Sequence, residues 1–133
     1  MDDHDPVRRS VCSLLSTDPT LDVVCESTNG EEAVTKAKEL QPDLVLSDIG
    51  LPGISGLQAA RQIRKVSAES RIIFLSQHNS LQMVREALKN GAHGYVTKSD
   101  AASELLGAIR AVLGGTYFVS QQIVEQGWVL ETI

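Results

Sequence analysis

Short apolar runs alternate with amphipathic stretches along the chain. The runs read as strands and occupy residues 22–26, 43–48, 71–76 and 94–98. The run at 43–48 is apolar at consecutive positions, as expected of a parallel strand that is covered on both faces. In the stretches that follow the runs, apolar residues recur at helical spacing. The predicted helices span approximately residues 29–40, 57–65, 81–89 and 100–113.

End signals bound these helices. Asn29 is placed to cap the first, and Asp100 is the predicted cap of the last. Gly91 stands where a helix C-cap glycine belongs. Strands that alternate with helices specify parallel βαβ units with right-handed crossovers, so the predicted fold class is a doubly wound α/β parallel sheet. In such sheets the functional crevice lies at the carboxyl ends of the strands.

Residues that can handle phosphate stand at the predicted strand ends. Asp48 offers a carboxylate, Ser76 a hydroxyl and Lys98 an ammonium group, and the pair Asp2-Asp3 lies near the start. Carboxylates gathered at one edge repel each other unless a cation lies among them, and hard oxygen ligands suit Mg²⁺. The set indicates attack by a carboxylate oxygen on phosphorus, with metal and lysine neutralising charge. Taken singly, each residue is more simply a turn or solvated residue.

Composition narrows the functional classes. The formal net charge is -5, which argues against nucleic-acid binding by this segment, because phosphate backbones are held by clustered Lys and Arg. Cys12 and Cys25 have no metal-ligand spacing and read as small buried residues in a reducing compartment. No apolar stretch approaches the length of a membrane span. We therefore expect a cytoplasmic protein that does not enter a membrane.

Four segments together resemble the receiver domain of two-component response regulators. They are Asp2-Asp3-His4, residues 44–56 with the pattern D-x-x-[LM]-P-x-x-x-G, residues 74–76, and residues 91–98. Order and spacing agree from residue 2 to about 118. The resemblance implies the flavodoxin-like receiver fold, with residues 1–118 as the phosphoacceptor domain and residues 119–133 as a linker or tail.

The resemblance also implies roles for individual residues. Asp48 would be the phosphoacceptor, and Lys98 would hold the phosphoryl oxygens. Ser76 would move toward the phosphoryl group, and Tyr95 would change rotamer with it. The implied ligands of a Mg²⁺ cofactor are the carboxylates of Asp2, Asp3 and Asp48 and the backbone carbonyl of Gly50.

Finer detail is similar to the NarL/FixJ type of regulator. The segments that carry this similarity are residues 2–4, 91–98 and 111–118. In that type a LuxR-type helix-turn-helix domain commonly follows the receiver and binds promoter DNA. The implied partners are a sensor histidine kinase, a second copy of the chain in a homodimer, and DNA only through an output domain that is not present in this chain.

One departure concerns the start of the chain. Receivers of this kind begin with an apolar strand that delivers the acidic pair, whereas Met1 directly precedes Asp2-Asp3 here. We expect either a start that is truncated relative to the natural one or another segment in the place of that strand. The apolar tail 127–133 is one candidate, in its own chain or in a neighbour, and a frayed or helical linker is the other interpretation of that tail. Weaker Mg²⁺ binding is expected in consequence.

Three functional classes compete. The first is a phosphorylation-controlled switch, and the second is a degenerate receiver that binds partners without phosphorylation. The third is an enzyme resembling aspartate-dependent phosphatases, which place a second aspartate two residues after the nucleophile. Position 50 is Gly, so the enzyme interpretation fails on its own motif. We expect a signalling protein and not an enzyme.

Overall fold

The computed structural model describes residues 5–21, 29–48, 55–77 and 80–127, with the side chains of residues 5–8 left aside. Several expectations fall outside these ranges: the strand at 22–26, the acidic pair Asp2-Asp3, Gly50, and most of the apolar tail.

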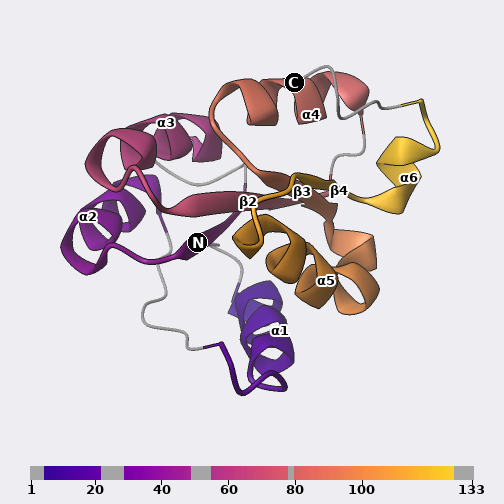
Figure 1. The fold of residues 1–133 in the computed structure, drawn as a ribbon, viewed down its shortest axis with the longest axis horizontal. Helices are drawn as coiled ribbons and strands as arrows, with labels where there is room; N and C mark the ends of the chain where they lie inside the picture. Colours follow the sequence, from indigo (N-terminus) through magenta and orange to yellow (C-terminus); the bar gives the residue numbers. More distant parts are fainter. Residues whose placement is uncertain (1–4, 22–28, 49–54, 78–79, 128–133) are drawn as a thin grey trace.

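A parallel sheet forms the centre of the described residues (Figure 1). Its strands are β1 (Leu44–Asp48), β2 (Arg71–Ser76), β3 (Gly94–Thr97) and β4 (Phe118–Val119). They lie in the order β1-β2-β3-β4, and every pair is parallel. The flanking helices are α1 (Asp5–Leu15), α2 (Gly30–Leu40), α3 (Gly56–Val66), α4 (Leu81–Lys89), α5 (Ala101–Leu113) and α6 (Gln121–Val124), with a 3-10 turn η1 (Lys98–Asp100). The predicted α/β fold class is confirmed.

Helices cover both faces of the sheet, with α1 and α5 on the lower side of Figure 1 and α3 and α4 on the upper side. Successive side chains of a strand point to opposite faces. Ile72 and Phe74 of β2 therefore pack in one core cluster, with residues of α3 and α4. Ile73 and Leu75 pack in the other, with residues of α1 and α5. The consecutive apolar positions of the strand are explained by this double burial.

Helix ends follow the sequence signals at most positions. Asn29 caps α2, since its side chain accepts a 2.8 Å hydrogen bond from the backbone N–H of Glu32. Gly91 follows the end of α4 with a φ of +100°, the left-handed conformation that glycine adopts without strain. The expectation for Asp100 was wrong in one respect. It occupies the N-cap position of α5, but its side chain makes no capping hydrogen bond, because it is engaged by Thr97 and Gln122.

The segment after α5 contributes more to the core than a linker would. Val119 of β4 and Ile123 of α6 belong to the cluster that also contains Phe74. The backbone N–H of Ser120 donates to the carbonyl oxygen of Tyr95, which extends the pairing of β4 with β3. The division of the chain at residue 118 stays a prediction, and residues 119–124 pack against the same sheet. No helix in the described part is long and apolar enough to cross a membrane.

Candidate functional site

Three polar residues meet at the carboxyl ends of adjacent strands. Asp48 ends β1, Ser76 ends β2, and Lys98 directly follows β3. The ammonium of Lys98 donates to Asp48 Oδ2 at 3.2 Å across 50 residues of sequence. Only 17% and 16% of the two side chains are exposed. The Coulomb attraction within a pair so shielded from water is screened less than in an exposed ion pair. The pair places a cation beside the carboxylate at the edge where α/β sheets bind ligands.

Ser76 and Tyr95 are two buried residues near this pair. Ser76 is buried at the end of β2, and Tyr95 is fully buried in β3. Burial raises the pKa of the Tyr95 hydroxyl, the negative charge of Asp48 raises it further, and a hydrogen bond with Ser76 partly opposes both. Tyr95 is therefore neutral at ordinary pH, with its ring in the core and its hydroxyl linked to the strand end of β2. The structure thus brings Ser76, Tyr95, Asp48 and Lys98 into one connected group.

A second network ties the end of β3 to the C-terminal segment. The backbone N–H of Thr97 donates to Ser120 Oγ at 2.9 Å, and this hydrogen bond is buried. Thr97 Oγ1 donates to Asp100 Oδ2 at 2.9 Å. The amide of Gln122 donates to Thr97 Oγ1 at 2.8 Å and to Asp100 Oδ2 at 2.5 Å. Helix α6 is therefore held against the turn that carries Lys98.

Sequence reasoning missed this second network. Gln122 lies 25 residues after Thr97 in a segment read as linker or tail, and a lone glutamine carries no motif. The strand before Gln122, β4, has two residues and is too short to show an alternating hydrophobic pattern. Ser120 and Thr97 are polar residues near strand ends. Serine and threonine side chains usually form hydrogen bonds with nearby backbone, so these two residues did not indicate a long-range network.

His93 is another residue whose surroundings the sequence did not reveal. Its Nδ1 accepts a 3.2 Å hydrogen bond from the backbone N–H of Ile72, and its ring stacks on Tyr117 with centroids 5.9 Å apart. Burial lowers the pKa of His93, and the charges of Arg64 and Arg71 lower it further. The imidazole is therefore held neutral, as the acceptor for a β2 amide.

The expected metal ligands lie only partly in the described residues. Asp48 lies in the described residues, whereas Asp2, Asp3 and Gly50 lie outside them. Within the described part no group of three or more His, Cys, Asp or Glu side chains is positioned to hold a metal ion. The Asp48 carboxylate is a hard oxygen ligand at a strand end, and its chemistry fits Mg²⁺.

Comparison with known proteins decides the family. The sequence model of the family called response regulator receiver domain matches residues 1–110 of this chain. This chain belongs to that family. Receiver domains are in general signal transducers and not enzymes, and they generally bind Mg²⁺ at the phosphorylation site.

Similar proteins indicate the type of receiver. The chain is 36% identical over 126 residues to the response regulator GacA of Pseudomonas viridiflava, covering 95% of this chain and 59% of GacA. It is 37% identical over 123 residues to the nitrate/nitrite response regulator protein NarL of Escherichia coli K12, covering 92% of this chain and 57% of NarL. This receiver therefore spans less than two thirds of the length of these relatives. Its similarity to them shows that it is of the NarL/FixJ type.

Solved structures agree with this assignment. A LuxR-family two-component response regulator from Aurantimonas sp. SI85-9A1 matches with a TM-score of 0.89 and 37% identity, over 93% of this chain and 89% of that one. The signal receiver domain of the NarL protein of Mycobacterium tuberculosis matches with a TM-score of 0.81 and 32% identity, over 86% and 92%. The receiver fold of this chain is thus shared along most of its length.

Proposed function

We propose that this receiver accepts a phosphoryl group on Asp48 and passes that event to an output domain. The observation that carries the proposal is the Lys98–Asp48 pair, 3.2 Å apart, at the strand ends that also hold the buried Ser76. A lysine in this position neutralises a carboxylate at rest and can pair with phosphoryl oxygens after transfer. The same pair speaks against a degenerate receiver, which would have no need to keep a shielded cation beside the carboxylate.

The proposed donor is a phosphohistidine of a sensor histidine kinase. An oxygen of the Asp48 carboxylate attacks phosphorus, the new P–O bond forms, and the P–N bond to the imidazole breaks. The electron pair of that bond stays on the imidazole nitrogen, which is then protonated from solvent. Lys98 stabilises the charge on the phosphoryl oxygens during transfer. Bound at Asp48 together with Asp2, Asp3 and the Gly50 carbonyl, Mg²⁺ would supply further charge neutralisation.

The response to phosphorylation would run through Ser76 and Tyr95. A phosphoryl group on Asp48 would offer new acceptor oxygens to the Ser76 hydroxyl. A hydrogen bond to these oxygens would compete with the hydrogen bond between Ser76 and Tyr95. Release of Tyr95 would change the side-chain contacts around β3, to which the segment after α5 is hydrogen-bonded. In the proposed whole protein this segment leads to a DNA-binding domain, and the regulator acts in the cytoplasm, with homodimerisation as part of its response.

Intact-mass measurement tests the phosphoacceptor directly. The protein is incubated with Mg²⁺ and acetyl phosphate, beside an Asp48→Asn variant and an Asp43→Asn variant, in which an exposed aspartate just before β1 is changed in the same way. We expect a gain of one phosphoryl group in the wild type and in Asp43→Asn, and none in Asp48→Asn. No gain in a wild-type protein shown to be folded by circular dichroism would contradict the proposal.

A further inference from the structure

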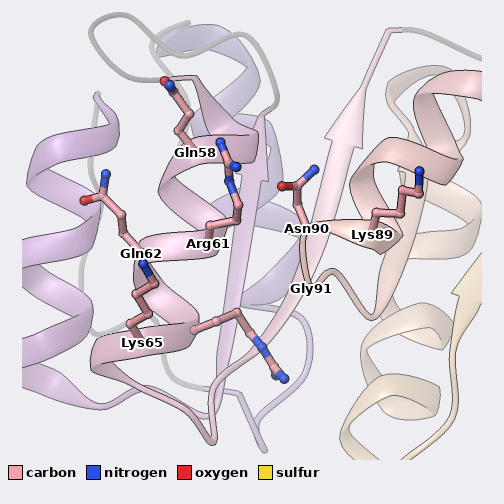
Figure 2. A pocket seen from close by; sticks show the side chains of 8 residues that line it. Gln58, Arg61, Gln62, Lys65, Lys89, Asn90 and Gly91 are labelled. Carbon is pink, nitrogen blue, oxygen red and sulfur yellow. The ribbon is translucent and has the colours of Figure 1, made fainter.

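A groove lies between α3 and the end of α4 (Figure 2). Its volume is about 640 Å³, and it shares no residue with the Asp48 group. Gly91 of the groove precedes β3, whereas Lys98 follows it. The Gly91 end of the groove and the phosphoacceptor therefore belong to opposite ends of the strands.

Cationic side chains dominate the lining of this groove. Arg61, Arg64 and Lys65 come from α3, and Lys89 comes from the last turn of α4. The other side chains are carboxamides, and no carboxylate lines the groove within the described part of the chain. A third of the 12 Lys and Arg residues of a chain with net charge -5 thus converge on one hollow. Their scattered positions in the sequence conceal this, because two helices are needed to bring them together.

Arg64 is held in place by its surroundings. A Cβ atom at Gly91 would lie 2.9 Å from Arg64 Cγ, so the aliphatic part of this arginine packs directly over the glycine backbone. Its Nη1 lies 3.5 Å from His93 Nε2. Because the neutral ring of His93 adds no charge there, the positive charge of Arg64 is not offset by a carboxylate in this contact. These two contacts therefore favour one position of the exposed Arg64 side chain beside the groove.

The four cations are exposed, so water and salt screen their mutual repulsion, and an anion in the groove would be attracted by all four charges. Arginine guanidinium groups form paired hydrogen bonds with phosphate oxygens, and lysines add point charges. The carboxamide of Asn90, which lies between Arg61 and Lys89 in Figure 2, adds a neutral donor and acceptor. The volume lies within the range of about 300–1,000 Å³ typical of small-molecule sites.

We propose that this groove binds a small polyphosphorylated anion, of the class of nucleoside triphosphates or short inorganic polyphosphates. A compact ligand keeps its charge within the hollow. A nucleic acid would extend onto the rest of a surface whose net charge is negative, where it would be repelled. The site is independent of phosphorylation at Asp48, and it does not depend on the proposed function.

Calorimetric titration tests this site with inorganic tripolyphosphate and, separately, with ATP, in EDTA so that no Mg²⁺ is present. We expect saturable binding with a Kd below about 1 mM that weakens as salt is raised, because the contacts are between charges. Tighter binding of ATP than of tripolyphosphate would identify a nucleotide site, and equal or weaker binding would identify a polyphosphate site.

Two double variants separate a built site from general attraction. Arg61→Gln with Lys89→Gln removes two exposed charges of the groove, and Lys36→Gln with Lys38→Gln removes the same charge from the exposed face of α2. We expect at least about tenfold weaker binding in the first and less than twofold change in the second. Equal losses in both variants, no saturable binding, or unchanged affinity in the groove variant would overturn the proposal. An Asp48→Asn variant should bind as the wild type does; lost binding there would place the ligand at the phosphoacceptor instead.

Discussion

The amide of Gln122 donates a hydrogen bond of 2.8 Å to the hydroxyl oxygen of Thr97. Thr97 directly precedes Lys98 in the chain. The contact joins the segment after α5 to the end of β3, directly before the cation of the proposed phosphoacceptor site. It is part buried, and Gln122 also donates to Asp100. Only a few hydrogen bonds therefore separate Lys98 and Tyr95 from the segment in which the described chain leaves the sheet.

Removing the Gln122 amide should therefore loosen α6. We expect Gln122→Ala to lower the free energy of unfolding by about 1 kcal/mol, since hydrogen-bond partners of a part-buried group are lost. Amide hydrogen exchange in residues 118–124 should become faster. Chemical denaturation and exchange mass spectrometry measure the two effects. Gln121→Ala, at an exposed neighbouring position, is the control and should change neither. Equal behaviour of the two variants would show that the network does not anchor α6.

Lys98 should matter for phosphorylation more than for folding. We expect Lys98→Ala to slow acetyl phosphate-dependent modification of Asp48 by about 10²-fold, since a cation that stabilises the transferring group is lost. Lys38→Ala removes an exposed lysine of α2 and should leave the rate unchanged. Time-resolved intact-mass measurements give both rates. A Lys98→Ala rate within twofold of wild type would remove Lys98 from the chemistry.

The His93 environment predicts how stability varies with pH. The folded protein lowers the pKa of His93 below the ordinary value of 6.5, so the unfolded chain binds the proton more readily. The free energy of unfolding should be fully retained above pH 6.5 and should fall as pH drops toward the folded pKa. His93→Asn cannot titrate in this range, and it should show a shallower fall. Denaturation midpoints at pH 7.5 and 5.5 measure this, and parallel slopes would refute it.

Much of the sheet and part of the site could be predicted from residue patterns. Short apolar runs predicted β1, β2 and β3, and parallel topology alone brings Asp48, Ser76 and Lys98 to one edge. The strand β4 and helix α6 could not be found, because two and four residues are too few for a period to register.

Polar contacts proved harder to predict than strands. Asp100 was a reasonable helix cap, yet Gln122 competes for its carboxylate from 22 residues away. The partners of His93 depend on the backbone of β2 and on Tyr117, which approach it only in the folded chain. Similar reasoning applies to Arg64 and Gly91, whose contact requires α3 and the end of α4 to be neighbours.

All four residues of β3 are buried, and the strand is paired on both sides within the described sheet. Bending such a strand would disturb both core clusters at once, so its backbone resists displacement. In the proposed function, a signal from Asp48 would therefore pass by exchange of side-chain partners around a fixed strand. One or two exchanged hydrogen bonds correspond to a coupling free energy of roughly 1–3 kcal/mol. In the proposed function that amount would bias two conformational populations by about 5- to 150-fold, which corresponds to a graded, readily reversible switch and not to an irreversible latch.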